Sequence, residues 1–152
     1  MKEQFVEFSA EVTGFTAFEL FGTGMADTYL DEVVTKRIGA DRLRKLLAAY
    51  SGIKPVTEQK VRTSRMRREI FGDEELGPIA RNIIKLWYLG IWEALPQGWV
   101  ETYGPIDDNK GFTVNASAYV EGLLWVAIGA NPPGAKAPGY GSWAHPPEIP
   151  AF

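Results

Sequence analysis

Apolar residues recur at helical spacing through the first two thirds of the chain. Phe5, Phe8, Val12 and Phe15 follow one another at intervals of three and four residues, which predicts an amphipathic helix that ends near Gly14. Glycine or proline then separates one apolar group from the next, so each group is expected to form its own helix. The further helices are predicted over residues 16–20, 25–39, 41–50 and 57–72.

Residues 75–95, ELGPIARNIIKLWYLGIWEAL, form the most apolar segment. Pro78 suits the first turn of a helix, where its missing N–H would have no partner in any case. The apolar residues cover more than one helical face, which is typical of a helix buried nearly all round. We therefore expect this segment to be the central helix, or to meet another protein with part of its surface.

A connection at about residues 94–114 interrupts the helical pattern. Loops of this length in compact domains are usually functional or disordered, and Trp99, Tyr103, Ile106 and Phe112 argue against disorder. A last helix is predicted over residues 116–129, with Tyr119, Leu123, Val126 and Ala127 on one face.

The predicted fold class is mainly α. There is no internal repeat and no convincing strand pair, so we expect one compact bundle of about six helices over residues 1–130. Residues 131–152 are rich in proline and glycine and also contain Tyr140, Trp143 and His145. This composition predicts an extended C-terminal arm rather than a separate domain.

Composition and charge exclude several kinds of site. A formal net charge of −3 and a pI near 5.2 argue against a nucleic-acid partner, which would favour a basic surface. Without cysteine the chain has no disulfide, iron–sulfur ligand or thiol nucleophile, and its single histidine argues against a zinc site. No apolar run reaches membrane-spanning length, and the N-terminal residues do not form a secretory signal. Arg67-Arg68 lies mid-chain and is not a twin-arginine signal.

The residues that could carry catalysis are few. His145 is the only general base of the usual kind, and it lies in a proline-rich segment that makes a poor rigid scaffold. Asp107 and Asp108, like the run of acids at residues 73–75, are interpreted as solvated or capping residues. The cations of residues 60–68 are either a binding patch for an anion or, as the negative chain favours, a solvated helix face balanced by nearby acids.

Aromatic residues are the more unusual feature. Five tryptophans in 152 residues exceed what a small helical core needs, and Trp and Tyr are enriched at protein interfaces. Proline limits the conformational entropy that an extended arm loses on docking, so the tail could bind a partner without forming a domain. The expected partner-binding residues are Trp87, Tyr88, Trp92, Tyr119, Trp125, Pro132, Pro133, Tyr140, Trp143, His145 and Pro146.

Two stretches carry a resemblance to a known family. IARNIIKLWYLGIWE (79–93) and ASAYVEGLLWVAIGANPPGAKAPGYGSWAHPP (116–147) resemble the small subunit of bacterial FAD-dependent sugar and polyol dehydrogenase complexes, of the sorbitol, fructose and glucose dehydrogenase type. FSAEVTGFTAFELFGTGMADTYLDEV (8–33) is similar to that family more loosely. These are shape and interface motifs rather than a chemical signature.

The resemblance implies a role in a complex. The expected partner is a catalytic subunit of the glucose–methanol–choline type that carries FAD and often an iron–sulfur cluster, with a cytochrome c subunit as a further partner. The small subunit itself would carry no cofactor or catalytic residue and would bind and stabilise the catalytic subunit. The implied location is the periplasm, in a membrane-associated complex. The sequence departs from the family in two ways. It lacks the export signal, so a cytoplasmic location stays an alternative, and it lacks any cysteine that could form an intersubunit disulfide.

Two other functions stay open at this point. The chain could be a self-sufficient sugar-binding protein or enzyme, with the aromatic residues as a stacking pocket and His145 or a carboxylate as base. Alternatively it could be a standalone helical scaffold or a homo-oligomer. The sugar or polyol itself cannot be predicted, because substrate choice would lie in the other subunit.

Overall fold

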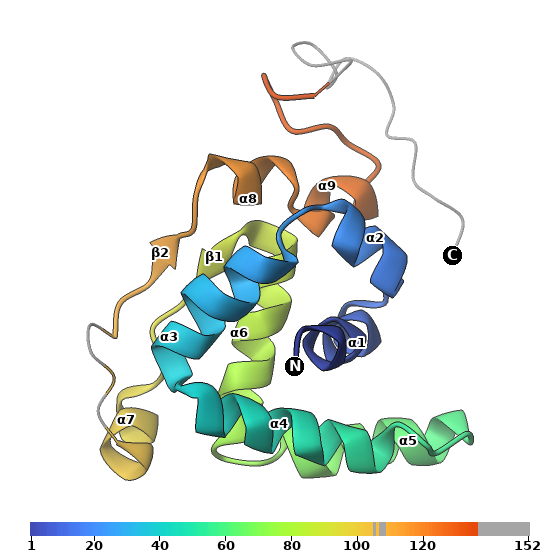
Figure 1. Ribbon diagram of the computed structural model, residues 1–152, viewed down its shortest axis with the longest axis vertical. Helices are drawn as coiled ribbons and strands as arrows, with labels where there is room; N and C mark the ends of the chain where they lie inside the picture. Colours follow the sequence, from blue (N-terminus) through green and yellow to red (C-terminus); the bar gives the residue numbers. More distant parts are fainter. Residues whose placement is uncertain (105, 107–108, 137–152) are drawn as a thin grey trace.

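The computed structural model describes residues 1–136 except Pro105, Asp107 and Asp108. The described part is compact and mainly helical, which confirms the predicted fold class (Figure 1). Its elements in chain order are α1 (Lys2–Thr13), α2 (Ala17–Gly22), the π-helical η1 (Thr28–Val34), α3 (Thr35–Ile38), α4 (Ala40–Ile53), α5 (Gln59–Met66), the π-helical η2 (Arg67–Phe71), α6 (Leu76–Leu89), β1 (Ile91–Trp92), α7 (Gln97–Tyr103), β2 (Phe112–Thr113), α8 (Ala116–Val120) and α9 (Leu123–Ala127).

Local signals in the sequence set three helix ends in the first half of the chain. Gly14 closes α1 in the left-handed conformation, and its N–H donates to the Ala10 carbonyl. Thr16 then begins α2 with a capping box, in which its hydroxyl accepts from the Glu19 N–H and the Glu19 carboxylate accepts from the Thr16 N–H. The predicted ends at Gly14 and Gly39 are confirmed.

Helix α6 is the centre of the core. It lies in the middle of the molecule and contacts α1, α4, η2, α8 and α9 (Figure 1). The Trp87 ring stacks against Phe5 of α1 at 6.3 Å between centroids and meets the edge of Tyr29 of η1 at 4.9 Å. Aromatic pairs in such geometries add to the stabilisation from burial. The prediction that this segment forms the central helix is therefore confirmed.

The end of α6 differs from the prediction. The helix stops at Leu89 because Gly90 turns the chain in the left-handed conformation, at φ +67°. Ile91 and Trp92 then pair antiparallel with Thr113 and Phe112. The expectation of no strand pair was wrong, because two-residue strands are too short to produce an alternating apolar pattern.

The predicted last helix is two short helices. Helix α8 ends at Val120 and α9 begins at Leu123, with the chain bending at Gly122. A Cβ on Gly122 would lie 2.8 Å from the Tyr88 carbonyl oxygen, and one on Gly90 would lie 2.7 Å from the Ala118 backbone. Glycine at these two positions lets α8 and α9 lie directly on the end of α6.

Side-chain amides hold the connection around residues 94–114 in place. Buried Asn82 of α6 donates to the Glu93 carbonyl at 2.8 Å and accepts from the Glu93 N–H. Asn109 pairs in the same way with both backbone groups of Leu95, each at 2.8 Å. The connection, which was expected to be irregular, also contains α7, in which Trp99 is buried.

The close approach at Gly90 makes a prediction about stability. Gly90→Ala combines a left-handed backbone with a clash against Ala118, so we expect it to lower the free energy of unfolding by about 2–5 kcal/mol. Gly14→Ala is the matched control, because Gly14 is also left-handed but a Cβ there would meet nothing within 4 Å. It should cost only about 1–2 kcal/mol in urea unfolding. Equal losses from both variants would contradict the close packing of α8 on α6.

Candidate functional site

Helix α2 presents aromatic side chains to solvent. Leu20 is fully buried, and Phe18, two residues away, therefore points from the opposite side of the helix. Phe18 is 87% exposed and Phe21, one turn further on, is 43% exposed. The capping box at Thr16 fixes the start of this short helix and with it the direction of both rings.

Helix α9 presents a second apolar face. Leu123 is buried against the core, whereas Val126 is 52% exposed and Ile128, just after the helix, is also exposed. Trp125 donates from Nε1 to the Tyr119 carbonyl at 2.7 Å, and the two rings meet edge to face at 5.3 Å. This contact joins α8 to α9 and fixes both aromatic side chains at the surface.

A hollow of about 250 Å³ lies between α2 and α9, which are neighbours in space (Figure 1). Phe15, Trp125, Val126 and Pro132 give it apolar walls. Lys136 also lines it and pairs with Glu121 at 2.7 Å. We call the hollow, together with the exposed Phe18, Phe21, Tyr119, Val126 and Ile128, the α2/α9 surface.

The sequence-predicted partner-binding residues occupy different environments. Trp87 and Trp92 are buried in the core, so they can support a surface but not contact a partner. Tyr88 is half-buried, its hydroxyl donates to the Thr13 carbonyl at 2.7 Å, and burial raises its pKa. Tyr119 is 41% exposed and Trp125 is partly exposed, so these two belong to the α2/α9 surface.

The predicted arm is described only at its beginning. Pro132 is buried against the α2/α9 hollow, and Pro133 is exposed. Tyr140, Trp143, His145 and Pro146 lie outside the described residues, so their predicted role stays a prediction.

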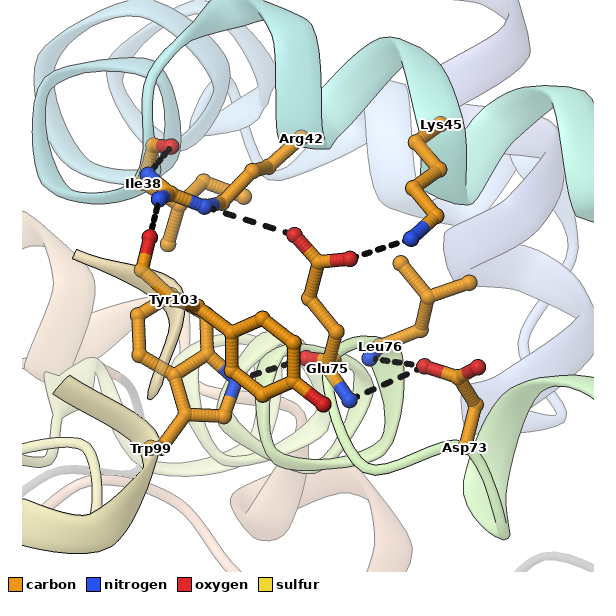
Figure 2. Close-up of polar contacts among 8 residues, drawn as sticks. All are labelled: Ile38, Arg42, Lys45, Asp73, Glu75, Leu76, Trp99 and Tyr103. Atoms are coloured by element: carbon orange, nitrogen blue, oxygen red, sulfur yellow. Dashed lines mark hydrogen bonds and ion pairs between the residues drawn. The ribbon is translucent and has the colours of Figure 1, made fainter. Parts of the chain in front are cut away.

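Two acids of the run at residues 73–75, Asp73 and Glu75, have structural roles. Asp73 Oδ1 accepts from the backbone N–H groups of Glu75 and Leu76 at 2.9 and 2.7 Å, which caps the start of α6. The Glu75 carboxylate pairs with Arg42, at 3.4 Å, and with Lys45, both from α4 (Figure 2). The interpretation of Asp73 as a capping residue is thus confirmed.

The same contacts hold α7 against the core. Trp99 Nε1 donates to the Glu75 carbonyl at 2.8 Å, and Arg42 donates to the Tyr103 carbonyl while its guanidinium lies 5.2 Å from the Trp99 ring (Figure 2). Glu75 is therefore committed to joining α4, α6 and α7, and it is not free to act as a base.

Phe18, Phe21 and Ile128 are the surface residues that the sequence analysis did not single out. A usable signal existed for Phe18. In a two-turn helix, residues two apart lie on opposite sides, so Phe18 and Leu20 could not both be buried against one core. Nothing in the sequence alone indicates which of the two faces outward.

Within the described residues there is no group of acids and histidines that could hold a metal ion. The α2/α9 hollow is smaller than the roughly 300–1,000 Å³ of sites that enclose drug-sized ligands, and a dinucleotide would not fit inside it. No helix of the described part is long and apolar enough to cross a membrane.

Comparisons with models of protein families, with curated proteins and with solved structures give no match for this chain.

The contacts of Glu75 lead to a second stability prediction. Glu75→Gln removes the charge that Arg42 and Lys45 share, so we expect the free energy of unfolding to fall by about 1–3 kcal/mol in urea unfolding. Glu74→Gln is the matched control, since Glu74 is the neighbouring acid and is exposed. It should change stability by less than about 0.5 kcal/mol. A Glu75→Gln protein as stable as the Glu74→Gln protein would contradict the role of this carboxylate.

Proposed function

We propose that this chain is the noncatalytic small subunit of a heteromeric FAD-dependent sugar or polyol dehydrogenase. In this role it binds and stabilises a catalytic subunit of the glucose–methanol–choline type, which carries the FAD. The observation that carries the proposal is the α2/α9 surface. Phe18 of α2 is 87% exposed, and Val126 of α9, which lines the hollow, is 52% exposed, so both side chains offer apolar area that another protein could bury.

The resemblance described above supports the choice of partner. Its two stretches, residues 79–93 and 116–147, correspond to α6–β1 and to α8–α9 with the following residues. These elements pack on each other at Gly90 and Gly122, so the described residues of the two stretches form one continuous part of the molecule. One edge of that part is the α2/α9 surface.

The positions of the aromatic side chains favour an interface over a sugar-stacking pocket. Trp87 and Trp92 are in the core, and Trp99 is buried against Arg42 and Glu75. Of the described tryptophans, Trp125 alone lines the α2/α9 hollow. A stacking pocket needs several exposed ring faces around one space, and the described residues do not gather them.

Further features of the complex belong to the same proposal. The partner would also carry any iron–sulfur cluster, and a cytochrome c subunit would accept its electrons. The complex would lie in the periplasm and associate with the membrane through its other subunits. A permanent interface of this kind buries roughly 2,000 Å² or more in total.

The proposal predicts a loss of the flavoprotein from a double variant. Phe18→Ser with Val126→Ser removes two exposed apolar side chains, and each apolar side chain buried on binding contributes about 1.5–3 kcal/mol. In a pull-down with the tagged chain, we expect the flavin absorbance that the variant recovers to be lower than that of the wild-type chain by a factor of about ten or more.

The control for this experiment is Val61→Ser. Val61 is 42% exposed on α5, and Figure 1 shows this helix apart from α2 and α9. It should retain the flavoprotein at the wild-type level, and all variants should keep the wild-type circular dichroism because the changed side chains are exposed. Full retention of the flavoprotein by the double variant would refute the proposed interface.

A further inference from the structure

Helix α5 and η2 carry the densest positive charge of the chain, with five cations in residues 60–68. The fold neutralises part of it. Arg62 Nε donates to the Glu11 carboxylate of α1 at 3.0 Å, and Arg65 pairs with Glu69 at 2.8 Å. Arg68 also reaches Glu69, and hydrogen bonds from Arg65 and Arg68 lower the pKa of that carboxyl to about 2. The Glu69 charge is therefore shared between two arginines.

Lys60 and Arg67 are different. Among the described residues, neither side chain meets a carboxylate, and both are exposed. They lie seven residues apart, on the same helical face as Ser64. Together with Gln59, Thr63 and Arg68, these residues line a shallow groove that is largely open to solvent. Its charged and polar donors favour a ligand that carries negative charge.

A second hollow of about 410 Å³ adjoins this groove, between α1 and the α5–η2 segment. Gln59, Thr63 and Arg67 border both. The second hollow is walled by apolar side chains of both elements, namely Val12, Met66 and Phe71. Glu11 lies at its edge, where Arg62 compensates its charge. The two hollows thus form one surface, with an apolar recess on one side and, on the other, two cations that meet no carboxylate in the described part of the chain. We call it the α5 surface.

We propose that the α5 surface binds an amphipathic acidic segment of a protein partner. Apolar side chains of the segment enter the recess beside Met66, and its carboxylates pair with Lys60 and Arg67. We choose an acidic segment because of charge complementarity. The α5 surface is positive on a chain of net charge −3, so it would steer an acidic segment toward it. The inference does not depend on the proposed flavoprotein partner.

The shape of the surface argues against other anionic partners. A membrane surface is bound by apolar side chains that project into the lipid, whereas Met66 is only 6% exposed and lies in a recess. The recess can receive a side chain that projects from a partner, but its own apolar side chains do not project far enough to enter a lipid layer. Single-stranded nucleic acid is held by exposed aromatic rings between the cations, and Phe71, the only aromatic side chain lining either hollow, is partly buried against the core.

The experiment measures binding of a synthetic probe to the full-length chain by fluorescence anisotropy. The probe is a short fluorescein-labelled peptide with leucines at helical spacings of three and four and glutamates between them. Lys60→Glu with Arg67→Glu should weaken binding at least about tenfold, because both reversed charges face the probe. Lys36→Glu with Arg44→Glu changes the net charge equally on an exposed face of α3 and α4 and should leave binding at the wild-type level.

A second probe tests the apolar recess. Replacing the leucines with serine keeps the charge of the peptide, and we expect it to bind at least about tenfold more weakly. Equal binding by both double variants, or equal binding of the two probes, would overturn the proposal. A vesicle experiment gives a further contradicting outcome. The peptide would fail to bind, the wild-type chain would sediment with vesicles of phosphatidylcholine and phosphatidylglycerol, and Lys60→Glu with Arg67→Glu would abolish that sedimentation. The surface would then face lipid.

Discussion

The close approach of two backbones at the end of α6 is the constraint on which the surface of this molecule depends. At Gly90 the chain leaves α6 within one residue, and at Gly122 the bend between α8 and α9 lies against the Tyr88 carbonyl. Neither position has room for a Cβ. Because α8 and α9 lie so close to the core helix, Leu123 is buried, while Trp125 and Val126 line the hollow beside α2 and Tyr119 remains at the surface against Trp125.

The same constraint explains which parts of the fold could be predicted. Ends set by local chemistry, such as the left-handed Gly14 and the cap at Thr16, can be read from neighbouring residues. The break at Gly122 could not, because its cause is a carbonyl more than thirty residues earlier in the chain. The β1–β2 pair has a similar explanation, since Gly90 and the amide of Asn82 position strands of only two residues.

The high content of aromatic residues suggested an aromatic interface, but most of the described tryptophans lie in the core. Trp87, Trp92 and Trp99 are buried, so the core uses more tryptophan than a small helical domain was expected to need. The exposed apolar area comes instead from Phe18, Phe21 and Val126, whose orientation depends on how two short helices pack. Of the predicted interface residues, Tyr119, Trp125 and Pro132 lie at that surface. A helical pattern gives the face of a long helix, but in helices of five or six residues tertiary packing decides it.

The described residues form one core, and the α2/α9 surface is the part of the molecule that we propose a flavoprotein covers. The most direct measurement is the mass and absorbance spectrum of the tagged, full-length chain purified from its native cells. We expect a heteromeric complex of defined mass that shows the absorbance bands of bound flavin. A colourless chain that elutes alone, or only with copies of itself, would contradict it.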